Sequence, residues 1–195
     1  MSGAVLNLYL CGVGGQGIGL LTETLGQACL AAGHVIHGCD THGLAQRGGT
    51  VISHLRLGQG VFTPRIPEGE AHVVIALERL EGLRGAQNYL RKGGALLYYD
   101  AVYQPVAVRT GQASYPDVAA IDAAVAEKNG VAHRVFVEGL ADPRMQNSAL
   151  MGRLAALELI PGVDVAVTEA AIRSAAPPAA LDANLAVFRK TAGGE

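Results

Sequence analysis

The sequence predicts an α/β fold of the Rossmann-like type, with a single doubly wound, mainly parallel sheet, helices on both faces and a helical C-terminal segment. Two observations support this prediction. Apolar runs of strand length alternate with stretches whose apolar residues recur at helical spacing, and three helical patterns follow one another in the C-terminal quarter. The chain has 195 residues, half of them apolar, and shows no repeat or linker, so we expect one domain over residues 1–195.

Short apolar runs mark the strands. They are predicted at residues 4–11, 35–39, 51–57, 72–77, 95–99 and 134–137, with a short edge strand at 105–109, where proline is tolerated. The first two strands and the helix between them form a βαβ unit. The run at 51–57 alternates as a half-exposed strand does, and the proline- and glycine-rich stretch 58–69 is expected to be a mobile surface loop.

Helical spacing marks the elements between and after the strands. Helices are predicted from Ile18 to Ala32, from Leu80 through Leu90 and over residues 116–128, followed by three C-terminal helices. Of these three, the first opens at Asp142 and Pro143 as N-cap and first-turn proline, the second is capped by Thr168, and the third starts at Pro177 and Pro178.

The composition narrows the functional classes. The formal net charge is −2 and no basic block occurs, so no nucleic-acid partner is expected. No apolar run reaches membrane-spanning length and no secretory leader is recognised, so we expect a cytoplasmic protein without a membrane partner. Cys11, Cys29 and Cys39 lie far apart, as reduced thiols do, and the histidines lack the spacing of metal ligands, so no metal site is expected.

A glycine-rich turn follows the first strand. Its residues are Gly12, Gly14, Gly15, Gln16 and Gly17, and the first, second and last glycine fall on G-x-G-x-x-G spacing. A helix that begins here directs backbone N–H groups and its positive dipole end at the turn, which favours an anion. Asp40 lies about twenty residues beyond, where dinucleotide-binding folds place an acid on a ribose hydroxyl. Alone, the turn predicts either a dinucleotide site or only a tight turn with close helix–sheet packing.

A second glycine element begins directly after Asp40. It contains His42, Gly43, Gln46, Arg47, Gly48 and Gly49 and leads into Val51-Ile-Ser-His-Leu-Arg56. The two elements together resemble the gamma subunit or gamma domain of the 2-oxoacid:ferredoxin oxidoreductases. That family shows G-x-G-G-Q-G near its N-terminus and H-G-x-A-Q-R-G-G before a strand of the S-H-x-R type. Asn147 and Asn184 stand where the family has N-x-x-x-L-G and a closing N-x-x-A-F.

Within the family, the chain is most similar to the small subunit of the indolepyruvate:ferredoxin oxidoreductases. The resemblance implies a hetero-oligomer that converts an aryl 2-oxoacid and CoA into acyl-CoA and CO2 and passes electrons to ferredoxin. Thiamine diphosphate, Mg²⁺ and iron–sulfur clusters would then belong to the large partner subunit. This chain would bind no cofactor alone, would hold no catalytic residue and would be inactive, and a homodimer is possible when it is isolated. A pyruvate- or 2-oxoglutarate-specific relative also remains open.

Two interpretations of the glycine elements stay open beside the resemblance. Their polar residues can bind a CoA phosphate or a partner subunit, or can simply hold the loop by hydrogen bonds. The rival hypothesis is an autonomous Rossmann-type protein that binds NAD or FAD through Gly12, Gly14, Gly17 and Asp40. A hydrolase triad of Ser53, His54 and Asp40 is disfavoured because no G-x-S-x-G element is present.

Overall fold

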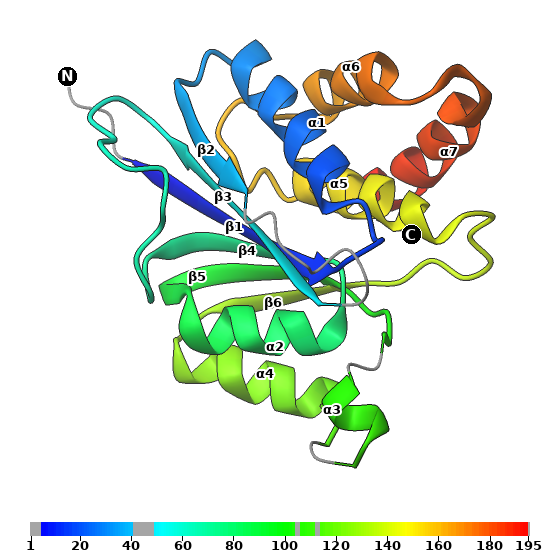
Figure 1. Cartoon of the computed structure of the whole chain (residues 1–195). Helices are drawn as coiled ribbons and strands as arrows, with labels where there is room; N and C mark the ends of the chain where they lie inside the picture. Colours follow the sequence, from blue (N-terminus) through cyan, green and yellow to red (C-terminus); the bar gives the residue numbers. More distant parts are fainter. Residues whose placement is uncertain (1–4, 41–48, 104–105, 112–113, 195) are drawn as a thin grey trace.

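The fold is a mixed six-stranded sheet with helices on both faces (Figure 1), as the sequence predicts. The computed structural model describes residues 5–40, 49–103, 106–111 and 114–194. The strand order is β2-β3-β1-β4-β5-β6. The strands are β1 (Leu6–Val13), β2 (Ile36–Asp40), β3 (Thr50–Leu57), β4 (Ala71–Ala76), β5 (Leu90–Tyr99) and β6 (Val131–Val135).

Strand β3 gives the sheet its mixed character. β1, β4, β5 and β6 pair in parallel, whereas β3 runs antiparallel to both β1 and β2. The sheet is therefore mainly parallel, as expected, but β1 and β2 are not neighbours. Helix α1 (Ile18–Ala31), which joins them, crosses over β3, so the predicted βαβ unit encloses an extra strand.

The inner position of β3 also corrects its predicted exposure. Ser53 is fully buried, and His54 and Leu55 are only 2% and 5% exposed, so the middle of the strand is covered on both faces. The neighbouring segment 58–69 is tied to this strand. Arg56 Nη1 donates to the Thr63 carbonyl at 2.9 Å and Ile66 N donates to His54 Nδ1 at 3.2 Å, while Ile66 itself is buried.

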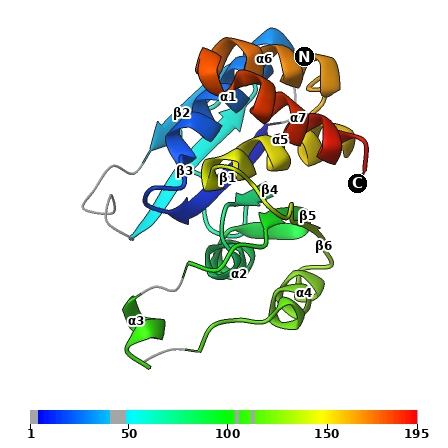
Figure 2. The same ribbon diagram turned by 90° about the vertical axis from the view of Figure 1, so that its right-hand side faces the viewer.

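The helices divide between the two faces of the sheet (Figures 1 and 2). Helices α1, α5 (Gln146–Ala156), α6 (Val165–Ala175) and α7 (Leu181–Ala192) cover one face, and α2 (Arg79–Asn88) and α4 (Val118–Glu127) cover the other. Alternate residues of a strand point to opposite faces. Accordingly, Leu8 and Leu10 of β1 pack into the core beneath α1 and α5, whereas Tyr9 and Cys11 pack into the core beneath α2 and α4.

The C-terminal helices form a closely packed layer. A Cβ placed on Gly152 of α5 would lie 2.3 Å from the Phe188 carbonyl oxygen of α7, so only glycine permits this approach. Phe188 is fully buried and Leu185 is 2% exposed, so the last helix packs these two side chains into the core. Asp142 accepts from Arg144 N and opens the 3₁₀ turn η2 (Pro143–Met145) that leads into α5, as predicted.

Other local predictions are wrong because tertiary pairing overrides spacing. Leu90 does not continue a helix: α2 ends at Asn88, and Leu90 starts β5 opposite Ala71 of β4. The last strand is Val131–Val135 rather than 134–137, since these residues pair in register with β5. Residues Val106–Arg109 form the short helix α3 and not an edge strand.

Thr168 is also not the cap of its helix. It is fully buried within α6, and the cap is Asp164, whose carboxylate accepts from Val167 N at 2.8 Å. An aspartate three residues before the bonded amide is the usual N-cap arrangement.

The third of the C-terminal helices, α7, is preceded by the 3₁₀ turn η3 (Pro178–Ala180), close to its predicted start. Among the described helices, none is long and apolar enough to cross a bilayer.

Candidate functional site

The glycine turn Gly12–Gly17 lies at the carboxyl end of β1, and Gln16 closes it from inside. The Gln16 side chain is 2% exposed; its amide oxygen accepts from Val13 N at 2.7 Å and its amide nitrogen donates to the Leu77 carbonyl at 2.7 Å. Both ends of the amide are therefore bonded within the protein. Gln16 fixes the turn to the end of β4. In this conformation its amide is not available to bind a ligand.

The positions of the turn require glycine for different physical reasons. A Cβ on Gly12 would lie 2.9 to 3.0 Å from atoms of Ile18, Gln16 and Leu77, so this position needs the missing side chain for packing. Gly17 is the N-cap of α1 with φ +81°, and Gly15 has φ +100°, in the region that glycine favours.

Two glycines expose their backbone, Gly15 in the turn and Gly19 in the first turn of α1. A Cβ on either would meet no atom of the described residues within 4 Å, and both residues are exposed. This open backbone lies at the first turn of α1. There the N–H groups without a helical partner and the helix dipole favour negative charge. The turn can therefore accept close contact with a phosphate or with the backbone of another chain.

The second glycine element reaches the first at its last residue. Gly14 N donates to the Gly49 carbonyl oxygen at 2.9 Å, which brings the start of β3 against the turn. The two glycine elements thus meet at Gly49. The other predicted residues of the second element, His42, Gly43, Gln46, Arg47 and Gly48, lie outside the described residues, and their roles stay predictions.

Asp40 ends β2 at a distance from the turn. It is exposed and lies opposite Ser53 of β3, and β3 separates β2 from β1. Two strand spacings place the end of β2 about 10 Å from β1. In a dinucleotide-binding fold the ribose-binding acid ends the strand next to β1, so this topology weighs against that role for Asp40.

The structure does not bring the residues of the disfavoured triad together. Ser53 and His54 are consecutive in a strand, so their side chains point to opposite faces. Burial and, secondarily, the charge of Arg65 lower the pKa of His54, and its Nδ1 accepts from Ile66 N. The His54 ring packs edge-on to Tyr9, with ring centroids 5.3 Å apart, so this histidine is part of the packing of the sheet.

Two buried carboxylates at the end of β4 were not expected from the sequence. Glu78 is fully buried, caps α2 by accepting from Glu81 N at 2.9 Å, and lies one residue after the carbonyl that Gln16 binds. Burial raises the pKa of Glu78 to about 7. Glu81 accepts from Thr50 Oγ1 at 3.1 Å and from Arg84 Nη1 at 2.7 Å.

The pattern that singled out Asp40 in the sequence, an acidic residue directly after an apolar run, also applies to Glu78. Glu78 is the first acidic residue after the apolar run 72–77, as Asp40 and Asp100 are after the apolar runs 35–39 and 95–99. Asp100, at the end of β5, is held by Arg79 of α2 at 2.6 Å and by Arg134 of β6 through Nε at 2.7 Å. The edge that carries the glycine turn therefore also holds a set of paired charges that join β5, β6 and α2.

Cys11 and Cys29 are poor ligands for a metal or cluster. Cys11 Sγ donates to the Glu81 carbonyl oxygen at 3.3 Å, and burial raises the pKa of Cys11 and brings that of Cys29 to about 12. Metal and cluster ligation needs the thiolate. In the part of the chain that the structure describes, no group of three or more His, Cys, Asp or Glu side chains is placed to hold a metal ion.

Asn147 contacts the glycine turn from the helical side. Its amide nitrogen donates to the Gly17 carbonyl oxygen at 3.0 Å, so α5 holds the start of α1. This is the residue that the sequence places in the N-x-x-x-L-G motif. The motif thus has a structural partner in the first glycine element, although the two are 130 residues apart.

Sheet order and glycine turn together define the class: an α/β protein in which β3 is inserted beside β1 and a glycine turn at the end of β1 contacts Gly49. Residues 7–193 match the family of pyruvate ferredoxin/flavodoxin oxidoreductases. The chain belongs to this family, which confirms the resemblance expected from the two glycine elements.

Relatives of similar length carry a name that is more specific than the family description. The chain is 36% identical over 189 residues to the indolepyruvate oxidoreductase subunit IorB of Pyrococcus horikoshii, which covers 93% of this chain and 92% of that protein. It is 35% identical over 187 residues to the protein of the same name from Thermococcus kodakarensis, with the same coverage.

Solved structures share the fold at lower identity. The gamma subunit of a keto/oxoacid ferredoxin oxidoreductase from Geobacter sulfurreducens superposes with a TM-score of 0.64 at 17% identity, covering 97% of this chain and 99% of that chain. A 2-oxoglutarate:ferredoxin oxidoreductase from Magnetococcus marinus, solved with 2-oxoglutarate, coenzyme A and succinyl-CoA bound, gives 0.66 at 17% identity. The match covers 98% of this chain but only 31% of that one, so there the same fold is part of a longer chain.

Proposed function

We propose that this chain is the small subunit of a 2-oxoacid:ferredoxin oxidoreductase that oxidises indolepyruvate or a related aryl 2-oxoacid. The observation that carries the proposal is the match to IorB proteins, which extends over more than nine-tenths of both chains. The reaction would use CoA, release acyl-CoA and CO2, and pass electrons to ferredoxin.

The cofactors are assigned to the large partner subunit. Thiamine diphosphate with Mg²⁺ and the iron–sulfur clusters would lie there. Burial raises the pKa of Cys11 and Cys29, which disfavours the thiolates that a cluster on this chain would need. The isolated chain would then be inactive. The three unpaired cysteines also support a reducing, cytoplasmic location.

The two glycine elements are the surface we assign to the partner subunit. Gln16 and Gly12 are used inside the fold, whereas Gly15 and Gly19 offer open backbone. Backbone without side chains allows another chain to approach closely. His42, Gln46 and Arg47 would belong to the same contact, and a CoA phosphate is the alternative ligand there.

Co-expression tests the proposal. The chain and the thiamine-binding subunit, purified separately and together, are assayed for CoA-dependent reduction of ferredoxin with indolepyruvate, pyruvate and 2-oxoglutarate. We expect activity only in the combined preparation and only with the aryl substrate. Equal activity of the large subunit alone would refute the subunit role, and a preference for pyruvate or 2-oxoglutarate would refute the substrate.

The glycine spacing supports one rival, an autonomous dinucleotide-binding protein. Calorimetry of the isolated chain with NAD, NADP, FAD and CoA separates the two. Tight dinucleotide binding that Asp40→Ala weakens would favour the rival. Because β3 separates β2 from β1, we expect no such binding.

A further inference from the structure

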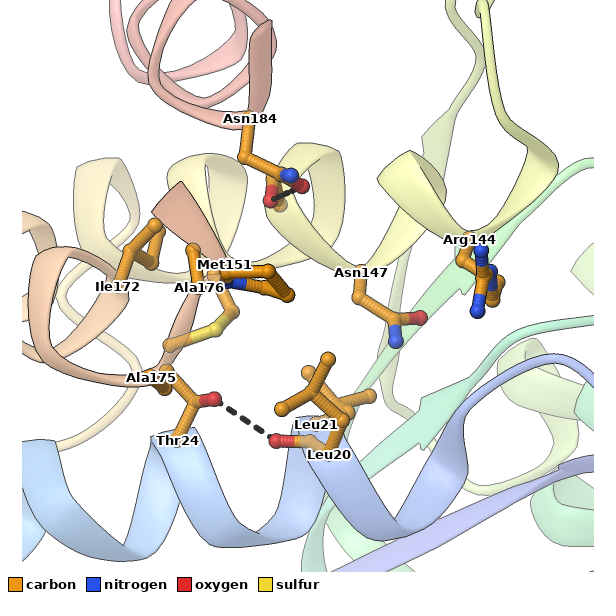
Figure 3. Close-up of a pocket in the computed structure, with 12 residues that line it drawn as sticks. Leu20, Leu21, Thr24, Arg144, Asn147, Met151, Ile172, Ala175, Ala176 and Asn184 are labelled. Atoms are coloured by element: carbon orange, nitrogen blue, oxygen red, sulfur yellow. Dashed lines mark hydrogen bonds between the residues drawn. The ribbon is translucent and has the colours of Figure 1, made fainter. Parts of the chain in front are cut away.

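Two hollows border α1 on the side of the C-terminal helices. One lies between α1, α5, α6 and α7 (Figure 3) and holds only about 40 Å³. The other is a groove between α1 and α6 with a volume of about 480 Å³. It is lined by Gln27 and Ala31 of α1 and by α6 residues that include Ala166, Val167 and Ala170. The walls of the α1–α6 groove are therefore mostly apolar, and it has room for a large side chain.

Exposed apolar side chains gather beside this groove. Leu30 is 62% exposed and Val165 is 38% exposed, and they directly precede two of the lining alanines. Val35, which follows α1, is 45% exposed. The segments that carry these residues are held together, because His34 Nε2 lies 2.7 Å from the Pro161 carbonyl oxygen. Clustered exposed apolar side chains are typical of surfaces that contact another protein.

Phe62 projects from the loop after β3 and is 99% exposed. The loop holds it in place on both sides: Val61 is 8% exposed, Ile66 is 3% exposed, and Arg56 Nη1 donates to the Thr63 carbonyl oxygen at 2.9 Å. A side chain that is presented by a fixed loop loses little conformational entropy when it is bound. Aromatic side chains that enter a pocket of the partner are common anchors of protein interfaces.

The Phe62 loop and the groove lie at the same end of the sheet. Gly58 N, at the start of the loop, donates at 2.8 Å to the carbonyl oxygen of Val35, shortly after the end of α1. In Figure 1 the loop after β3 and the end of α1 lie along the upper side of the molecule. The glycine turn lies at the opposite end, because β3 runs antiparallel to β1 and Leu57 pairs with Leu6. A contact through the Phe62 end leaves the glycine elements free.

The charges that flank the two features have opposite signs. Arg65 is the charged residue nearest to Phe62 along the chain, and it is exposed. Asp164 is exposed beside the groove, where its Oδ1 caps α6. In the described part of the chain neither side chain has an ion-pair partner. A second copy that presents Phe62 to the groove can therefore bring opposite charges together.

We propose that two copies of this chain associate through this end, with Phe62 of each copy inserted into the α1–α6 groove of the other. The contact is reciprocal, so it closes at two copies. Each inserted aromatic side chain buries about 150–250 Å². Leu30, Val35 and Val165 enlarge the apolar area around it. The proposal concerns the chain alone and does not rest on the subunit function.

Sedimentation velocity of the full-length chain over a dilution series measures the association. We expect a monomer–dimer equilibrium with a dissociation constant of about 10 μM or below. Phe62→Ala removes both inserted rings and should weaken the dimer about a hundredfold, tenfold for each ring. The matched control is Phe136→Ala. Phe136 is 59% exposed but follows β6 at the other end of the sheet, so the dissociation constant should not change.

A mixture of two variants tests the insertion itself. Ala170→Glu places a charge in the groove and leaves Phe62 intact, so it should also weaken the dimer. In the mixture, Phe62 of the Ala170→Glu chain can still enter the unaltered groove of the Phe62→Ala chain. With a fluorescent label on one variant, we expect this mixed dimer to form about tenfold more tightly than the Phe62→Ala dimer, because one of two insertions is kept.

Three results would overturn the proposal. The unaltered chain stays monomeric at about 1 mM, or Phe62→Ala leaves the dimer intact, or the mixture associates no more tightly than the separate variants. A monomeric chain whose binding to the thiamine-binding subunit is weakened by Phe62→Ala would assign Phe62 to that subunit instead. These results are obtained without an activity assay, so they are distinguishable from a failure of the proposed subunit function.

Discussion

The glycine turn is held from two sides by buried amides, and the two sides differ in how fully the amide is bonded. On the β4 side, Gln16 both accepts from Val13 N and donates to the Leu77 carbonyl. On the α5 side, Asn147 donates to the Gly17 carbonyl, but its oxygen has no partner among the described residues. The Gln16 amide therefore contributes two hydrogen bonds to the turn and the Asn147 amide only one. The two sides can be compared by mutation.

The largest effect is expected for Gln16→Ala. The change removes two hydrogen bonds and leaves Val13 N and the Leu77 carbonyl buried without partners. We expect the free energy of unfolding to fall by about 2–4 kcal/mol. Urea denaturation followed by circular dichroism measures it. Gln27→Ala, at a half-buried residue of helix α1, should change stability by less than about 0.5 kcal/mol. Similar effects for the two variants would show that the β4 side does not hold the turn.

The β4 side should also respond to pH through Glu78. Burial raises the pKa of Glu78 from 4.5 to about 7, so the folded state keeps a proton that the unfolded state has released. Stability should therefore fall as pH rises through this interval, by up to about 3 kcal/mol, and be constant above it. Urea titrations across the interval should show that Glu78→Gln removes this slope, while Glu23→Gln, on the exposed face of α1, leaves it unchanged. A slope that persists in Glu78→Gln would assign the titration to another group.

The smallest effect is expected on the α5 side. Asn147→Leu removes one hydrogen bond to Gly17 but also removes a buried oxygen that has no partner in the described part of the chain. The two changes oppose each other, so the free energy of unfolding should change by no more than about 1 kcal/mol. The same urea titration measures it. A loss as large as that of Gln16→Ala would show that Asn147 is as structural as Gln16 and would remove the contrast between the two sides.

The contrast also shows what sequence spacing can predict. The glycine turn, the helix after it and the second glycine element are recognised from local patterns. The contact between Gly14 and Gly49 is seen only in the folded protein. The place of β3 does not follow, because strand order depends on which edges pair across the whole sheet. Glu78 was missed for the same reason, since its burial is decided by α2 and by the segment around Tyr103, whose N contacts it at 3.4 Å.

The amino-acid sequence by itself determined the class of fold, the two glycine elements and the family, because each depends on residue types at short, regular spacing. Tertiary structure decided the rest. It placed β3 between β1 and β2, which moves Asp40 away from the turn, and it brought Asn147 to Gly17 across 130 residues. Whether a buried amide has all its partners depends on atoms that only folding brings together, so only the folded protein distinguishes Gln16 from Asn147.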